Sequence, residues 1–171
     1  MINRGLPGAG ALLVATILQI GLAPRIAIFG VVPNFIFLVV VTLALVEGPV
    51  AGCVAGFFGG LLFDLLGTSP IGPYALVLCS VGYVAGMLTA NMFAEGWLLP
   101  VSVVFVAGLV SEISYGILLA VLDVGHPFWA SFAQVMLPGA VYNTVLAVLA
   151  FPLLARLLRQ DRSVMSFKRL A

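Results

Sequence analysis

Long apolar runs with few charges constrain this chain more than any other feature of its sequence. A helix needs about 20 consecutive apolar residues to cross the hydrocarbon core of a bilayer. Hydrophobic residues make up 63% of the 171 residues and charged residues only 8%, whereas soluble domains average about 45–50% and about 25%. A soluble fold of this length could not bury so much apolar surface. We therefore expect six membrane spans, at residues 6–22, 26–46, 49–66, 72–90, 98–122 and 138–158.

Turn-forming residues and charges separate these runs, as at Pro24-Arg25, Glu47-Gly48-Pro49, 67–70, 91–96 and 123–127. Backbone groups in lipid must be paired within their own segment, and the runs lack the alternating pattern of a membrane β-barrel. The sequence therefore predicts an all-α, six-transmembrane-helix bundle. It predicts one domain over residues 1–159, a basic tail over 160–171, and a short aromatic-rich helix at the membrane interface over 128–137.

The charges predict how the chain is oriented. Five of the seven basic residues lie within 156–171, and basic segments favour the cytoplasmic side. An even number of spans then places Arg4 on the same side, so both termini are expected to be cytoplasmic. Pro24 follows the small residues that end the first run and argues against cleavage of a signal peptide. A net charge of +1 provides no field that would attract nucleic acid.

Glycines recur every four residues in the third run. The row consists of Gly48, Gly52, Gly56 and Gly60, and it ends at Asp64. Small residues at this spacing let a neighbouring helix approach closely within lipid. Because four residues advance a helix by about 40° beyond one turn, the row forms a slowly winding groove. We expect packing within this chain, with a partner's helix in the groove as the alternative.

Asp64 lies next to Gly67, near the C-terminal end of its predicted helix. The helix dipole disfavours a negative charge at that end. We therefore expect compensating donors from Thr68, Ser69 or backbone N–H groups. The structural interpretation is that Asp64 fixes the turn, and the alternative is contact with a partner or a ligand.

Glu112 lies midway along 98–122, with Gly108 and Gly116 four residues to either side. Ionisable residues at that depth are costly and usually face the interior of a helix bundle. We expect a buried, protonated structural glutamic acid under a closely packed helix. Contact with a partner or ligand, and proton coupling, are the alternatives. For the polar pair Tyr142-Asn143 in the last run, we expect an internal helix–helix hydrogen bond.

Catalysis and metal binding find little support in the sequence. The single histidine, His126, lies in a predicted loop, and the single lysine lies in the tail. Asp64 and Glu112 are predicted at different depths, unlike the facing carboxylates of an aspartyl protease. Cys53 and Cys79 lack metal-site spacing, and we expect no disulfide between them. We therefore expect neither an enzyme nor a cofactor nor a metal site.

Several marks follow one another in a distinctive order. They are Pro33-Asn34, Glu47-Gly48-Pro49, the glycine row into Phe63-Asp64-Leu65-Leu66-Gly67, the run 70–76, and Gly82-Tyr83-Val84-Ala85-Gly86. Near the end come Pro138, Tyr142-Asn143 and the run 152–156 before a basic tail. Over nearly the whole chain this order resembles the MreD family of bacterial rod shape-determining proteins. Asn34 stands where that family commonly has Asp after the proline.

The resemblance implies a non-enzymatic scaffold in the bacterial inner membrane that serves cell elongation, peptidoglycan synthesis and cell shape. The implied partner is the transmembrane helix of MreC. The implied wider complex contains MreB, RodA and a class B penicillin-binding protein. The family's fold is similar to the S components of energy-coupling-factor transporters.

That similarity provides the main alternative function, a vitamin-binding S component. Such a protein needs a polar pocket open to the outside. The outer segments offer few polar side chains, which favours the scaffold. Copurification of a small ligand would favour the transporter.

Overall fold

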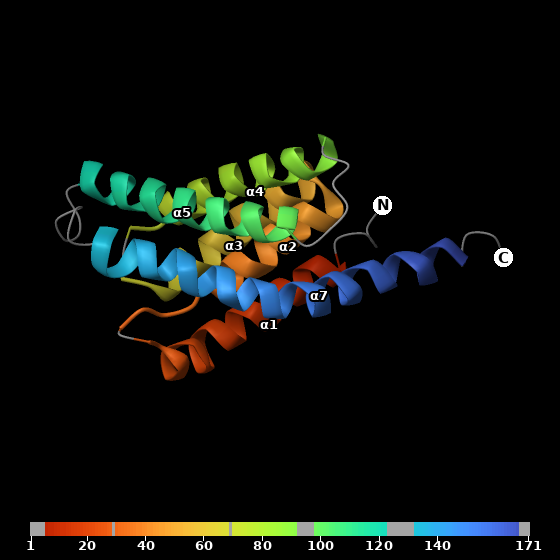
Figure 1. Ribbon diagram of the computed structural model, residues 1–171, viewed down its shortest axis with the longest axis horizontal. Coiled ribbons are helices and arrows are strands. Elements are labelled where there is room, and N and C mark those ends of the chain that lie inside the picture. Colours follow the sequence, from red (N-terminus) through yellow and green to blue (C-terminus); the bar gives the residue numbers. More distant parts are fainter. Residues whose placement is uncertain (1–5, 29, 69, 92–97, 123–131, 168–171) are drawn as a thin grey trace.

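The computed structural model describes residues 6–28, 30–68, 70–91, 98–122 and 132–167. Its elements are α1 (Leu6–Gly21), the 3-10 turn η2 (Ala23–Ile26), α2 (Phe35–Glu47), α3 (Pro49–Leu66), α4 (Pro73–Asn91), α5 (Leu98–Val121), the π-helical turn η3 (Phe132–Met136) and α7 (Leu137–Phe167). The predicted all-α class is confirmed. Figure 1 shows α4 and α5 along one side and α1 along the other, with α1 beginning and α7 ending at the same end of the bundle.

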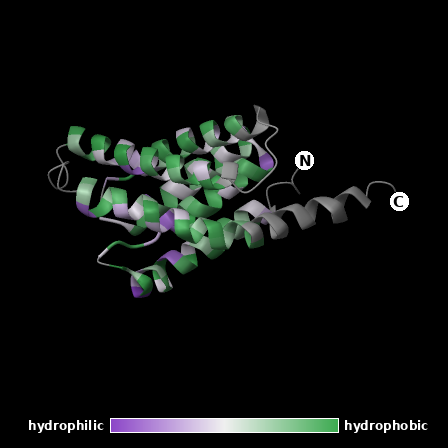
Figure 2. Ribbon diagram, viewed as in Figure 1, coloured by the Kyte–Doolittle hydropathy of each residue, from purple (hydrophilic) through white to green (hydrophobic). Residues whose placement is uncertain are grey.

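The helices have the apolar character of a membrane protein. Among the described residues, three helical segments are long and apolar enough to cross a membrane: Pro49–Leu66, Val101–Val121 and Phe132–Phe151. Three more are apolar but shorter: Pro7–Gly21, Phe35–Glu47 and Pro73–Leu88. Hydrophobic residues predominate along the described helices (Figure 2), and many large apolar side chains are exposed on the outside of the bundle. The chain is therefore a helical membrane protein, whose outward side chains suit lipid rather than water.

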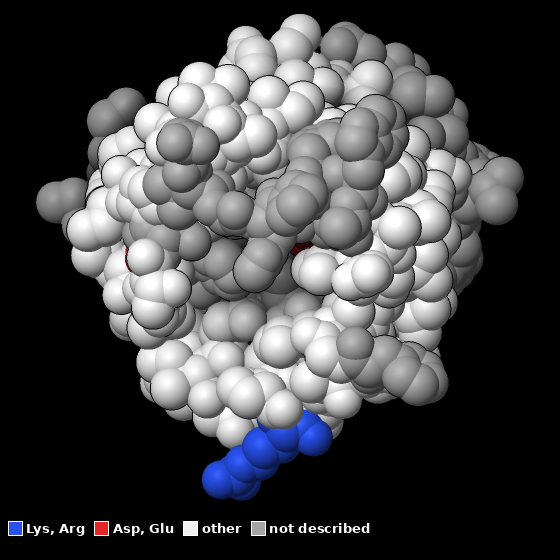
Figure 3. Space-filling model, turned by 90° about the vertical axis from the view of Figure 1, so that its left-hand side faces the viewer, with Lys and Arg blue, Asp and Glu red and all other residues white. Residues whose placement is uncertain are grey.

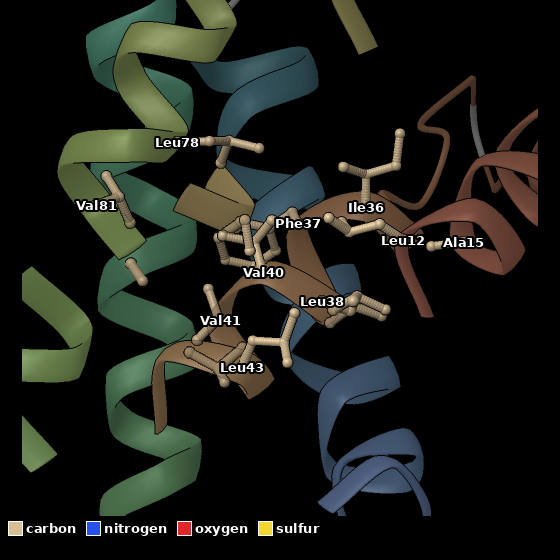
Figure 4. Packing of buried hydrophobic residues seen from close by; sticks show 14 of the residues in the cluster. Leu12, Ala15, Ile36, Phe37, Leu38, Val40, Val41, Leu43, Leu78 and Val81 are labelled. Atoms are coloured by element: carbon tan, nitrogen blue, oxygen red, sulfur yellow. The ribbon is translucent and has the colours of Figure 1, made fainter. Parts of the chain in front are cut away.

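Helix α2 forms the centre of the bundle. Every residue from Ile36 to Ala44 is buried, as expected of a helix that is apolar on all sides. It contacts α1, α3, α4, α5 and α7. Figure 4 shows side chains of α2 packed together with those of α1 and α4, and the labelled residues are Leu12, Ala15, Ile36, Phe37, Leu38, Val40, Val41, Leu43, Leu78 and Val81. The other helices are thus arranged around one central helix.

The predicted span 26–46 is wrong at its start, because α2 begins only at Phe35. Proline disfavours a helical conformation in the residue before it, and Pro33 therefore interrupts the run. Asn34 is extended, with φ −111° and ψ 93°, and its side chain accepts a hydrogen bond from the Phe37 N–H. This is the geometry of a helix N-cap. The predicted span was too long because it was based on apolar composition, which does not register the capping signal Pro33-Asn34.

The remaining boundaries agree with the sequence more closely. Helix α3 has the predicted bounds, and α1, α4 and α5 differ from their predicted spans by one residue at most at each end. Helix α7 begins one residue early and continues to Phe167, so the first part of the predicted tail is helical. Residues 132–136 of the predicted interfacial segment lead directly into α7. Most of the predicted breaks at 91–96 and 123–127, and residues 128–131, lie outside the described residues.

The glycine row packs against α4 of the same chain. A Cβ atom added at Gly52 would overlap the Gly82 carbonyl oxygen, and one at Gly56 would overlap that of Leu78. A Cβ at Gly60 would likewise collide with the backbone of Ala75. The two backbones are therefore in direct contact along most of α3, and the face of the row is filled from within the chain.

We predict that Gly56→Ala lowers the free energy of unfolding in detergent by about 1–3 kcal/mol, the usual cost of overpacking a tight contact. Gly10→Ala is the matched control, because a Cβ at this helical glycine of α1 meets nothing within 4 Å. That change should be neutral or stabilising by about 0.5–1 kcal/mol. Thermal unfolding followed by circular dichroism measures both. Equal effects of the two substitutions would contradict direct backbone packing.

Candidate functional site

The N-terminus of α2 is held by a group of polar side chains from four helices or their caps, here called the Asn34 cluster: Gln19, Asn34, Tyr74 and Asn143. Besides accepting from Phe37, the Asn34 side chain donates through Nδ2 to the Tyr74 hydroxyl at 2.7 Å. The Asn34 backbone N–H donates to Oδ1 of Asn143 at 2.8 Å. Asn34, Tyr74 and Asn143 are all buried. The start of α2 is thereby connected to α4 and α7.

Gln19 of α1 completes this group. Its Nε2 donates to the Pro33 carbonyl at 3.1 Å, and its Oε1 accepts from the Phe35 N–H at 2.9 Å. These bonds satisfy backbone groups that the proline and the helix start leave without intrahelical partners. Gln19 was not among the residues predicted from the sequence, although it is the one side-chain amide in α1. A polar amide side chain within the apolar run 6–22 is the feature that could have indicated its role.

Tyr142 and Asn143 are neighbours on α7, and both bind backbone groups near the start of α2. The Tyr142 hydroxyl donates to the Ile26 carbonyl at 2.6 Å, while Asn143 accepts from the N-cap of α2. In the sequence between Ile26 and Asn34, the backbone groups of Ile28 and Val31 form hydrogen bonds with each other. Irregular backbone within a membrane protein is tolerated where protein groups satisfy it. The structure thus brings together four predicted site residues: Pro33, Asn34, Tyr142 and Asn143.

Tyr74 connects this cluster to aromatic neighbours. Its ring is fully buried, 4.5 Å from the Phe63 ring of α3 and 4.9 Å from the Tyr115 ring of α5, measured between centroids. The Tyr115 contact is edge-to-face, which favours an aromatic pair by about 0.5–1.5 kcal/mol beyond area burial. One tyrosine therefore links α2, α3, α4 and α5. From the sequence, Tyr74 was part of a motif, and no role was predicted for it.

Asp64 caps a helix other than its own. Its carboxylate accepts from the backbone N–H groups of Gly72 at 2.9 Å, Tyr74 at 3.1 Å and Ala75 at 3.2 Å. These donors form the first turn of α4, where unpaired N–H groups and the helix dipole both favour an anion. Asp64 is only 2% exposed. The compensating donors predicted for this carboxylate are thus backbone N–H groups, and they come from α4.

The second group of predicted residues lies between α5 and α7. Gly108 and Gly116 are buried on α5, and a Cβ at Gly108 would come within ordinary contact distance of Ala140 on α7. Glu112 between them is half-buried, and its Oε1 lies 3.9 Å from where a Cβ on Gly139 would stand. Glu112 therefore faces the first turns of α7. No hydrogen bond between its carboxylate and another described residue is present.

The arrangement is suited to holding helices together. Within the described chain, every buried side-chain nitrogen and oxygen atom has a hydrogen-bond partner. The same residues contain no group of three or more His, Cys, Asp or Glu side chains that could hold a metal ion. Figure 3, which shows the face on the left-hand side of Figure 1, has only small parts of acidic side chains visible on it. The polar side chains of the Asn34 cluster join α1, α2, α4 and α7.

We predict that Asp64→Ala lowers the free energy of unfolding by about 1–3 kcal/mol, because buried N–H groups at the start of α4 lose their acceptor. Asp64→Asn should cost less, since one oxygen can still accept these bonds. Ser80→Ala is the control: this exposed hydroxyl donates to the Leu76 carbonyl of its own helix, so a change within about 0.5 kcal/mol is expected. Thermal unfolding measures all three. A neutral Asp64→Ala would disprove the capping role.

We predict that Asn34→Asp is tolerated within about 1 kcal/mol, whereas Asn34→Ala costs about 1–2 kcal/mol through loss of the N-cap. A carboxylate keeps the acceptor for the Phe37 N–H, and the Tyr74 hydroxyl can turn to donate to it. Adding Tyr74→Phe removes that donor, so the Asn34→Asp protein should then become clearly less stable. Equal losses for Asp and Ala at position 34 would contradict this account.

Comparison with known proteins places this architecture in a family. The sequence model of the rod shape-determining protein MreD matches residues 2–161. No curated protein and no solved structure matches the chain significantly. The family match includes the Asn34 cluster, the glycine row, Asp64 and Glu112, and it covers far more than half of the sequence. The chain therefore belongs to the MreD family of rod shape-determining membrane proteins.

Proposed function

We propose that this protein is a non-enzymatic scaffold of the cell-elongation complex in the bacterial inner membrane, and that it binds the transmembrane helix of MreC. In this role it supports peptidoglycan synthesis and cell shape, within a complex that includes MreB, RodA and a class B penicillin-binding protein. Membership of a shape-determining structural family supports the proposal. The start of α1 and the end of α7 at one end of the bundle (Figure 1) suit cytoplasmic termini.

The observation that carries the proposal is an open apolar groove of about 570 Å³ between α4 and α5. Its walls consist mainly of aliphatic side chains, and several lining residues are small (Ala or Ser), which leaves the groove open. The lining residues are Leu76, Val77, Ser80, Val81, Val84, Ala85, Leu88, Ser102, Val103, Val106, Ala107, Val110, Ser114, Ile117 and Leu118. Close packing against small residues favours helix association within lipid, where apolar burial alone gives no drive. The groove therefore suits a single apolar helix lying along the bundle.

The glycine row is a poorer docking surface. Its face is filled by the backbone of α4, so a partner's helix could reach it only by separating α3 from α4. The α4–α5 groove needs no such rearrangement. We therefore propose this groove, rather than Gly52, Gly56 and Gly60, as the surface that receives the MreC helix. In this proposal the glycine row acts indirectly, by holding α4 in place as one wall.

A matched set of substitutions tests the groove. Val84→Trp on α4 and Val110→Trp on α5 place a large ring into it, one from each wall. We expect each to reduce copurification with the MreC transmembrane helix by at least about tenfold, which corresponds to ~1.4 kcal/mol. Val145→Trp on α7 is the control, because Val145 is 53% exposed, like Val84 at 55%, but does not line the groove.

The readout is affinity purification in mild detergent, with the amount of membrane-inserted protein measured in parallel. Unchanged binding by Val84→Trp and Val110→Trp would contradict the groove. Equal loss with Val145→Trp would point to a general effect on the lipid-facing surface. Retention of lipid in place of the helix in the wild-type groove would also count against the proposal.

A vitamin-binding S component is the second candidate. The observation favouring it is Glu112, a half-buried carboxylate without a hydrogen bond to another described residue. The neighbouring polar side chains, Asn34, Tyr74 and Asn143, are already engaged with one another or with backbone. Recognition of a polar vitamin needs several free donors and acceptors. The scaffold is therefore the better-supported function.

A further inference from the structure

The two cysteines of the chain meet across the contact between α3 and α4. Cys53 lies on α3 and Cys79 on α4, and their Sγ atoms are 2.8 Å apart. Both are free thiols and both are half-buried. A disulfide bond is about 2.05 Å long, so closing one here requires the sulfurs to approach by less than about 1 Å. From the sequence, a disulfide between the two was not expected, because such bonds are rare outside oxidising compartments.

The close approach is a consequence of the glycine contacts on either side. Gly52 meets Gly82 next to this pair, and Gly56 meets Leu78. A disulfide requires Cα atoms about 4.4–6.8 Å apart, which most helix pairs, with axes about 8–10 Å apart, reach only at their closest crossing. Backbone contact at the flanking residues provides that crossing. The position of the thiols is thus set by the packing rather than by their own interaction.

The pair is accessible from lipid. Side chains on the same faces of the two helices, three and four residues away, point outward: Val50 and Phe57 beside Cys53, and Leu76 and Tyr83 beside Cys79. All four are exposed on the apolar surface of the bundle. A reagent that dissolves in the bilayer therefore reaches the thiols along a lipid-facing seam.

We propose that Cys53 and Cys79 form an oxidation site, at which a lipid hydroperoxide converts the two thiols into a disulfide that joins α3 to α4. One thiol gives up its proton, its thiolate sulfur attacks the terminal peroxide oxygen, and the O–O bond breaks. A sulfenic acid forms, and the alcohol leaves with the thiol's proton. The second thiol sulfur then attacks the sulfenic sulfur, the S–O bond breaks, and water leaves with the second proton. Two electrons pass from the thiols to the peroxide.

The crosslink has a structural consequence that can be measured. It joins α3 and α4 covalently within the bilayer, at a point on the two helices separate from the Asp64 cap. Oxidised protein should therefore unfold at a higher temperature than reduced protein, because the crosslink restricts the unfolded chain. The rise should be larger in Asp64→Ala, where the cap no longer holds the two helices together.

The test uses the purified full chain in lipid nanodiscs, treated with cumene hydroperoxide as a lipid-soluble probe. We expect a monomer lighter by two hydrogen atoms in intact mass spectrometry, loss of both maleimide-reactive thiols, and reversal by dithiothreitol. Since the chain has two cysteines, an intramolecular disulfide can only be this one. Cys53→Ser and Cys79→Ser, each with one thiol left, should show no such loss.

Two results would overturn the proposal. The first is that both thiols stay reactive, or oxidise only to sulfinic acid or to disulfides between chains, under conditions that oxidise a lipid-exposed reference thiol. The second is that hydrogen peroxide at equal concentration acts as fast as cumene hydroperoxide, which would exclude access through lipid. A preference for cumene hydroperoxide together with a reversible intramolecular disulfide supports the site.

Discussion

The carboxylate of Asp64, placed at the start of α4, is the interaction on which the rest of this structure depends. This side chain lies almost fully out of solvent, and three backbone N–H groups donate hydrogen bonds to it. The same bonds fix the height of α4 relative to α3, and this height determines which residues face one another along the seam. Glycine opposite glycine, and cysteine opposite cysteine, follow from that register. Tyr74, one of the capped residues, then carries the constraint to Asn34.

Around this seam, the protein solves a general problem of membrane proteins, which is how to change direction without exposing unpaired backbone. At the turn from η2 into α2, side chains of α1 and α7 bind the carbonyls of Ile26 and Pro33 and the N–H groups of Asn34 and Phe35. Each of these bonds is worth little alone, about 0.6 kcal/mol on average in a membrane protein. Their value lies in direction, because an amide or a hydroxyl accepts only a narrow range of partner positions. Apolar packing provides cohesion, and the polar bonds select one arrangement of the helices.

Much of this could be predicted from the sequence, and the failures have physical causes. Turn residues gave the bounds of α3 because Gly48-Pro49 and Gly67 leave little choice. The need of Asp64 for donors followed from its place at a helix end. The start of α2 was misplaced because the apolar run continues across Pro33-Asn34, where the proline and the N-cap determine the start of the helix.

Which residues meet across helices could not be predicted at all. Gln19 and Tyr74 act on segments far away in the sequence, and the meeting of Cys53 with Cys79 depends on the crossing of two helices. The glycine row indicated a close contact but not its partner, since α4 and a foreign helix present the same kind of surface. Pairwise geometry of this kind is a property of the assembled bundle.

The connection between α2 and α3 has a consequence for how the protein is made. Gly48 alone separates the two helices, and its φ of 97° lies in the left-handed region that favours glycine. Helix α2, with 13 residues, is about 20 Å long and falls short of the hydrocarbon core, which is ~30 Å thick. Because a single residue connects the two helices, α2 is not expected to enter the bilayer before α3. We expect the two helices to enter the bilayer together as a hairpin, so that insertion of the central helix depends on the helix that follows it.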